Sequence, residues 1–95
     1  MISSFRCRET AKVFARERSR KFSGIERAAL VKLPLLEGAD RLDDLRVPPG
    51  NRLEKLSGDR QGQWTIRINS QWRICFRWNG TSADDVEIVD YTLMV

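Results

Sequence analysis

Histidine is absent from the 95 residues of this chain, and Cys7 and Cys75 are its only cysteines. Because histidine and cysteine are the usual zinc ligands, a zinc site of ordinary composition is not expected. Two cysteines without a CxxC pair are typical of reduced, structural thiols. Any acid–base chemistry must therefore use Asp, Glu, Lys, Tyr or Arg, and we expect no metal or other cofactor.

The chain also has no apolar run long enough to cross a bilayer, and residues 1–12 lack the apolar stretch of a secretory signal. Its apolar content of 41% is that of a globular protein, and its length suits one domain with a modest core. We therefore expect a single soluble, cytoplasmic domain over residues 1–95, without a membrane partner.

Acidic residues are scarce in two parts of the chain. Residues 1–34 carry nine basic and three acidic side chains, and residues 51–78 carry six and two. Such basic blocks indicate an anionic partner, either nucleic acid or an acidic protein segment. For the first block, a solvated helix face explains the charge equally well.

The stretch from Trp64 to Trp78 (WTIRINSQWRICFRW) has the clearest pattern in the sequence. Apolar and polar residues alternate along both of its halves, and a period of two predicts a hairpin of half-buried strands. If the apolar residues share one face, residues 69–71 form the loop. This register places Arg67 directly opposite Arg73.

Like charges that face each other across a strand pair are destabilising. One interpretation of Arg67 and Arg73 is a paired cationic site for an anion such as a phosphate, because a guanidinium group can bind two oxygens at once. The alternative is two solvated side chains that diverge into water.

Helical patterns precede this hairpin. We expect a short strand over residues 2–7 and a helix over residues 8–20, whose apolar residues recur at helical spacing. A second helix should begin at the capping box Ser23-x-x-Glu26 and end at Gly38, with a kink or a restart at Pro34.

Short strands and turns make up the rest of the chain. Residues 39–51, which include the run PPGN, predict an irregular connector, and residues 52–56 predict a short strand. In the last strand, over residues 86–91, Val86 and Ile88 alternate with Glu87 and Val89. This order predicts an α+β fold: an N-terminal strand and two helices on one face of an antiparallel sheet of about four strands. The arginine face should remain open.

The run PPGNRLEKLSGDRQGQWTIRINSQWRICFRW, followed by VEIVDY, resembles the HigB toxins of bacterial toxin–antitoxin modules, which belong to the RelE superfamily. Its specific motifs are GDR-x-G-x-W and QWRICF, and the resemblance covers essentially the whole chain. It implies a RelE-like fold and a ribosome-dependent mRNA endonuclease that acts in the ribosomal A site. The implied partners are a HigA-like helix-turn-helix antitoxin, the 30S subunit and mRNA, with operator DNA bound only through the antitoxin.

The resemblance also implies site residues. The arginine of QWR corresponds to Arg73, which would bind the scissile phosphate, and the terminal Asp-Tyr pair corresponds to Asp90 and Tyr91. The catalytic candidates are Arg73, Arg67, Tyr91, Glu54 and Asp90. The RNA-binding candidates are Arg52, Lys55, Ser57, Arg60 and Arg77.

The implied reaction is a transesterification in which the ribose 2′-OH attacks the neighbouring phosphate and the 5′-oxygen leaves. It requires charge stabilisation and two proton transfers. Glu54 is the only carboxylate near the front edge of the sheet that we expect to act as a base, and Tyr91 could stack on a nucleotide, hydrogen-bond to it or donate a proton. The alternatives are a salt bridge from Glu54 to Lys55 or Arg52, and simple edge packing for Tyr91.

Thr92 departs from the family pattern. HigB toxins commonly end Asp-Tyr-His, and a threonine cannot shuttle a proton near pH 7. The alternative function is therefore a catalytically weak or inactive homologue that binds the ribosome or RNA, or acts as a co-repressor with its antitoxin. A stand-alone DNA-binding protein fits poorly, because no helix shows the pattern of a helix-turn-helix recognition helix.

Overall fold

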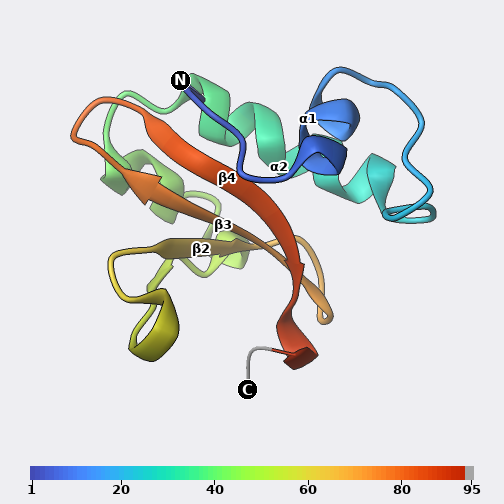
Figure 1. The fold of residues 1–95 in the computed structure, drawn as a ribbon. Helices are drawn as coiled ribbons and strands as arrows, with labels where there is room; N and C mark the ends of the chain where they lie inside the picture. Colours follow the sequence, from blue (N-terminus) through green and yellow to red (C-terminus); the bar gives the residue numbers. More distant parts are fainter. Residues whose placement is uncertain (94–95) are drawn as a thin grey trace.

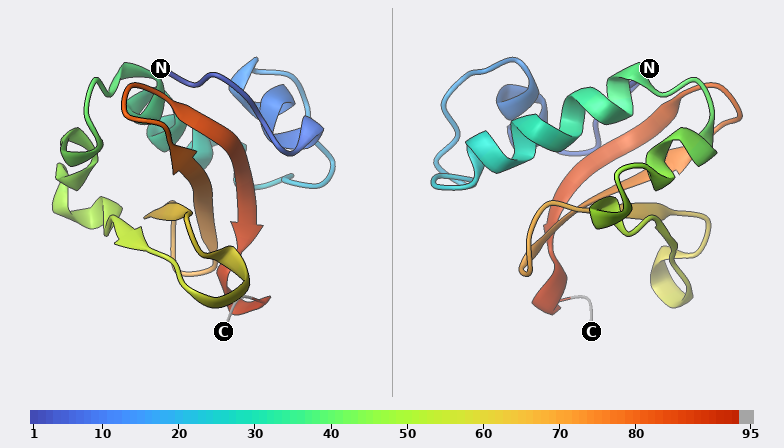
Figure 2. Two further views of the ribbon diagram at one scale, coloured as in Figure 1. Left: turned by 60° about the vertical axis from the view of Figure 1, so that its left-hand side comes forward. Right: turned by 180° about the vertical axis from the view of Figure 1, so that it is seen from behind.

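Two helices precede a four-stranded antiparallel meander in the computed structural model, which describes residues 1–93. The helices are α1 (Arg8–Phe14) and α2 (Glu26–Gly38). The strands are β1 (Glu54–Lys55), β2 (Trp64–Arg67), β3 (Trp72–Trp78) and β4 (Ala83–Asp90), paired in that order. Both helices lie on one side of the twisted sheet (Figures 1 and 2), so the predicted α+β fold is confirmed.

The core lies between α2 and the inner face of the sheet. Leu33 and Leu36 of α2 are fully buried in one cluster with Ile66, Ile74 and Phe76 of the hairpin. Burying an aliphatic or aromatic side chain of this size contributes about 1.5–3 kcal/mol. The apolar face of the hairpin therefore lies under the helices, as its alternation predicts.

The predicted register of the hairpin is confirmed. Ile66 pairs with Ile74 and Arg67 pairs with Arg73. The loop owes its shape to Asn69, whose Oδ1 accepts hydrogen bonds from the backbone N–H groups of Gln71 (2.9 Å) and Trp72 (2.8 Å). Asparagine favours turns through such side-chain-to-backbone bonds.

The predicted helix over residues 8–20 is too long, because α1 ends at Phe14. Arg16 adopts a left-handed backbone with φ of 63°, which a continuing helix does not permit. The predicted capping box is also wrong. Ile25 occupies the N-cap of α2, and the Glu26 carboxylate accepts a hydrogen bond from the backbone of Ser19 instead. α2 then runs through Pro34 without restarting and ends at Gly38.

The N-terminal segment differs from the strand predicted over residues 2–7. It makes two isolated parallel bridges to β4, Ile2 with Ala83 and Phe5 with Val86. Between these bridges Asp85 has a φ of 53°, which bends β4 and interrupts regular pairing. The segment still covers the outer edge of β4 (Figure 1), an edge that would otherwise be free to pair with another chain.

The connector over residues 39–51 is more regular than predicted. It contains 3₁₀ turns at Leu42–Arg46 and Pro49–Asn51. Buried Asn51 holds them together by donating to the carbonyl oxygens of Leu45 and Val47. Within residues 1–93, no helix is long and apolar enough to span a membrane.

Candidate active site

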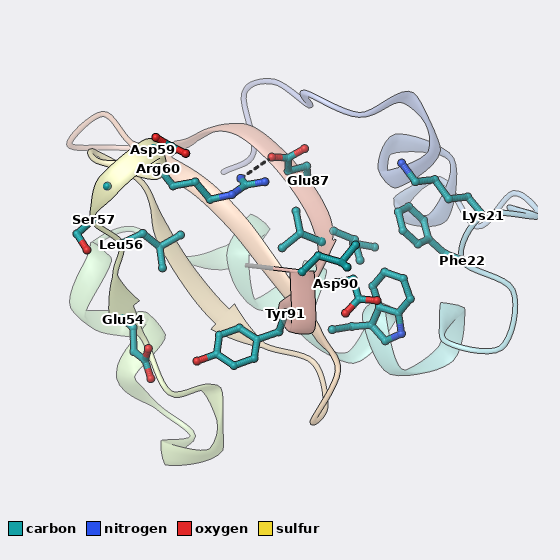
Figure 3. Close-up of a pocket in the computed structure, with 15 residues that line it drawn as sticks. Lys21, Phe22, Glu54, Leu56, Ser57, Asp59, Arg60, Glu87, Asp90 and Tyr91 are labelled. Atoms are coloured by element: carbon teal, nitrogen blue, oxygen red, sulfur yellow. Dashed lines mark hydrogen bonds and ion pairs between the residues drawn. The ribbon is translucent and has the colours of Figure 1, made fainter. Parts of the chain in front are cut away.

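A cleft of about 770 Å³ opens between the loop that follows β1 and the end of β4. Figure 3 shows Glu54 and Ser57 on one side of it and Lys21 and Phe22 on the other, with Tyr91 projecting between them. Half of the predicted site residues line this cleft: Glu54, Ser57, Arg60, Asp90 and Tyr91.

The two arginines of the hairpin share one face of the sheet but do not line the cleft. Arg73 is only 6% exposed, and its side-chain Nε and Nη1 atoms are buried without a hydrogen-bond partner among residues 1–93. Its guanidinium carbon lies 4.1 Å from the centroid of the Tyr91 ring, which covers it. The alternative of two solvated arginines therefore does not hold for Arg73. Arg67 is half-buried and so keeps part of its contact with solvent.

Buried donors without an acceptor are rare, because each loses its bond to water and gains nothing in return. For a neutral group this costs about 1–3 kcal/mol, and more for a charged one. The Arg73 guanidinium thus provides N–H groups that an anion could satisfy, beside the second positive charge of Arg67.

Asp90 anchors the turn that carries Tyr91. Its Oδ1 accepts hydrogen bonds from the Thr92 hydroxyl (2.6 Å) and the Thr92 backbone N–H (2.9 Å), and its Oδ2 accepts one from the Gln71 amide (3.0 Å). The Thr92 hydroxyl, followed by the Gln71 amide, lowers the pKa of the Asp90 carboxyl. Both oxygens of this carboxylate are therefore occupied.

Tyr91 lies just beyond β4, in a 3₁₀ turn over Tyr91–Leu93. The predicted strand over residues 86–91 instead spans Ala83–Asp90. The Tyr91 backbone N–H donates to the Gln71 carbonyl at 2.5 Å, which ties the turn to the hairpin loop. The half-buried phenol thereby faces Arg73 and the cleft together.

Arg60 reaches the same face of the sheet from the 3₁₀ turn Gly58–Arg60. Its Nη1 lies 2.8 Å from Glu87 Oε1 and 3.1 Å from Gln63 Oε1. The hydrogen bond to Glu87 raises the pKa of Arg60 above its ordinary value. Beneath it, burial raises the pKa of the Cys75 thiol, so this cysteine is held in its neutral form.

Glu54 shares the cleft with other carboxylates. Asp59, Glu87 and Asp90 also line it. Glu87 is paired with Arg60 and Asp90 is held by its neighbours, whereas Glu54 makes no ion pair among residues 1–93. The alternative of a salt bridge to Lys55 or Arg52 is thus not found. No three His, Cys, Asp or Glu side chains in this range are grouped to hold a metal.

Arg52, Lys55 and Arg77 lie outside the cleft. Lys55 pairs with Trp64, so it projects from the opposite face of the sheet, and its Nζ lies 5.9 Å from the Trp64 ring centroid. Arg77 lies near Asp85, with 3.7 Å between Nε and Oδ2. Arg52 is exposed.

Sequence reasoning missed three charged cleft residues, Lys21, Asp59 and Glu87. The alternation of Glu87 with Val86 and Ile88 places Glu87 on the face of the arginines, and this signal could have identified it. No sequence pattern around Lys21 predicts that it lines the cleft, because its position depends on the path of the loop between α1 and α2.

Comparison with known proteins identifies the family. The model of the RelE-like toxin of type II toxin–antitoxin system HigB matches residues 4–92. Toxin HigB-1 of Vibrio cholerae serotype O1 is 48% identical over 56 residues, which cover 59% of each chain. An uncharacterized protein of Haemophilus influenzae is 29% identical over 55 residues, 58% of this chain and 54% of that one.

The matched stretch thus spans little more than half the length of these two curated relatives. The family model, in contrast, extends over nearly all of the chain, from before α1 to the turn after β4. This chain belongs to the HigB-like family of RelE-like toxins of type II toxin–antitoxin systems.

Proposed function

We propose that this protein is a cytoplasmic, ribosome-dependent mRNA endonuclease that inhibits translation by cutting mRNA in the A site of the 30S subunit. The main support is the buried Arg73, whose Nε and Nη1 find no acceptor in the described part of the chain, and which pairs with Arg67 across the hairpin. In a HigB-like toxin, the chemical group that best satisfies such a pair is an RNA phosphate.

In this mechanism Arg73 binds the scissile phosphate and Arg67 strengthens the positive field around it. As the phosphorane forms, negative charge grows on its oxygens, and donors fixed in advance stabilise that charge. Losing one such donor typically slows a reaction by a factor of about 10²–10³.

Glu54 is the candidate general base, because it lines the cleft without an ion-pair partner among residues 1–93 and pairs with Thr65 on the arginine face of the sheet. Asp59 is also without an ion pair in this range, but it lies in the turn after β1 and not in a strand. It takes the proton of the 2′-OH as the O2′–P bond forms. The P–O5′ bond breaks, and the 5′-oxygen gains a proton, for which the Tyr91 hydroxyl is the candidate donor. The products are a 2′,3′-cyclic phosphate and a 5′-hydroxyl. Asp90 contributes by holding the turn that carries Tyr91.

The remaining predicted residues serve RNA binding. Ser57 and Arg60 line the cleft and would contact the nucleotides beside the cut. Arg52, Lys55 and Arg77 lie outside it and would contact more distant phosphates of the mRNA or the ribosome. We further propose that a HigA-like helix-turn-helix antitoxin neutralises the protein and carries it to operator DNA.

Expression in growing cells tests the enzymatic function. Arg73→Ala should abolish growth inhibition while circular dichroism shows the native fold. Primer extension on mRNA from induced cells should reveal cuts within codons for the wild type and none for this variant. Full toxicity of folded Arg73→Ala would remove Arg73 from the mechanism.

Substitution of two cleft carboxylates, Glu54 and Asp59, tests whether Glu54 is the general base. Glu54→Gln should slow cleavage by a factor of about 10²–10⁴, the usual contribution of a general base. Asp59→Asn is the control, because it removes a charge from the same cleft wall without removing the proposed base. Equal losses in the two variants would assign the effect to electrostatics.

One structural observation favours a second function, a toxin homologue that binds the ribosome or RNA, or represses with its antitoxin, but cuts weakly or not at all. Asp90 is fully engaged, and the residue after Tyr91 is Thr92, which supplies no titrating group. Growth arrest without any mRNA cut would support this function. A large gain of cleavage in Thr92→His would show that the native turn limits catalysis.

A further inference from the structure

The Tyr91 ring blocks the very donors on which the proposed function depends. Only 6% of Arg73 is exposed, and its Nε and Nη1 have no hydrogen-bond partner within residues 1–93. The ring centroid stands 4.1 Å from the guanidinium carbon, and the cleft is lined by Tyr91 and not by Arg73. Figure 3 shows Tyr91 in this cleft. A phosphate that enters the cleft therefore meets the phenol before Arg73.

We propose that Tyr91 is a movable cover over a phosphate site on Arg73, and that Asp90 and Thr92 hold this cover closed in the free protein. The inference rests on the proposed function, since it takes a phosphate as the ligand. It adds that the free protein is in a closed state, and it assigns Thr92 as a positioning residue.

The location of Tyr91 suits a part that moves. The regular pairing of β4 ends at Asp90, and Tyr91 begins a three-residue turn in which Thr92 and Leu93 are exposed. Rotation of this short turn would uncover Arg73 without disturbing the core, because none of its residues belongs to the buried cluster.

The latch consists of bonds at the surface. Asp90 receives the Thr92 hydroxyl and backbone N–H on one oxygen and the Gln71 amide on the other. The Gln71 carbonyl also receives the Tyr91 N–H. Water can replace hydrogen bonds between exposed groups. These bonds therefore hold the turn closed but still allow it to open.

A guanidinium that stacks on an aromatic ring gains attraction from the face of the ring, but its N–H groups remain without acceptors. A phosphate oxygen would supply both a negative charge and an acceptor for these N–H groups, through short charge-assisted hydrogen bonds. When only a fraction of molecules is open, the apparent affinity falls by that fraction. Removing the cover should therefore tighten phosphate binding.

The test uses the full chain and inorganic phosphate, followed by NMR at the Arg73 Nε–Hε group. Tyr91→Ala should bind phosphate roughly tenfold more tightly than the wild type, a gain of about 1.4 kcal/mol. Tyr91→Phe keeps the ring and should bind like the wild type. Thr92→Val removes only the latch hydroxyl and should bind phosphate a few-fold more tightly than the wild type. Thr92→Ser keeps a hydroxyl at this position and should bind phosphate like the wild type.

Cleavage assays on the same variants separate this inference from the proposed function. Equal phosphate affinity in the wild type and Tyr91→Ala, with mRNA still cut by the wild type, would overturn the cover and leave the nuclease in place. Tighter binding in Tyr91→Ala, with no mRNA cut by the wild type, would support the cover and overturn the nuclease. Phosphate that leaves Arg73 Nε–Hε unmoved in every folded variant would overturn the phosphate site and its cover, and mRNA cleavage by the wild type would then decide the nuclease separately.

Discussion

Arg67 stands directly opposite Arg73 in the β2–β3 pair, and neither forms an ion pair within residues 1–93. Strand pairing fixes the two backbones, so the two positive charges are held on one face of the sheet. The fold therefore carries an electrostatic cost that an anionic ligand would offset.

Removing one charge of this pair should stabilise the protein. Arg67→Gln is expected to raise the free energy of unfolding by about 0.2–1 kcal/mol at low salt, since like charges across a ladder repel. The gain should shrink at high salt, where the charge of the half-buried Arg67 is screened. Urea unfolding of both proteins at two salt concentrations measures it. Loss of stability at low salt would show that the pair is not repulsive.

Arg73→Met should separate stability from activity. It replaces the buried guanidinium, whose Nε and Nη1 have no partner in the part of the chain that the structure describes, with an apolar chain of similar length. We therefore expect about 1 kcal/mol of added stability. Thermal unfolding measures this gain, which corresponds to about 4–8 °C for a domain of this size. Growth inhibition by the same variant should be abolished. A destabilised but toxic variant would contradict both expectations.

The Asp90 carboxyl should titrate below its ordinary range. Because its pKa is lower in the folded chain than in the unfolded one, the bonds it accepts stabilise the fold above about pH 4, the unfolded value. That contribution is lost as the pH falls through the folded pKa. NMR titration of the Asp90 carboxyl should show the lowered pKa in the wild type and a higher one in Thr92→Val. An unchanged pKa in that variant would exclude the Thr92 hydroxyl as its main cause.

Gly62 should resist substitution. Its φ is 90°, and a Cβ placed there would lie 2.6 Å from Nη1 of Arg77. Gly62→Ala is therefore expected to cost about 1–2 kcal/mol, mostly from the left-handed backbone, since the arginine tip can move aside. Gly38→Ala is the matched control: nothing lies within 4 Å, and alanine at the end of α2 should gain up to about 1 kcal/mol. Chemical denaturation compares the two, and equal effects would contradict the backbone argument.

Local patterns predicted the sheet better than the helices. The alternation around Ile66 and Ile74 has one register that keeps all apolar residues together, and the structure has that register. The helical patterns predicted an end of α1 that is too late and a start of α2 that is too early. The basic stretch after Phe14 remains compatible with a helix, but the chain turns at Arg16 so that buried Phe22 can pack edge-on against Trp72, with 5.7 Å between ring centroids.

The sequence by itself determined the α+β order, the hairpin and the placement of Arg67 opposite Arg73, because side-chain direction in a strand follows from a period of two. The tertiary structure alone decided that Tyr91 covers Arg73, that Glu87 pairs with Arg60, and that Lys55 lies on the opposite face of the sheet. These contacts join segments whose mutual approach depends on turns and loop paths. Local propensity does not specify such paths, whereas packing of the whole chain does.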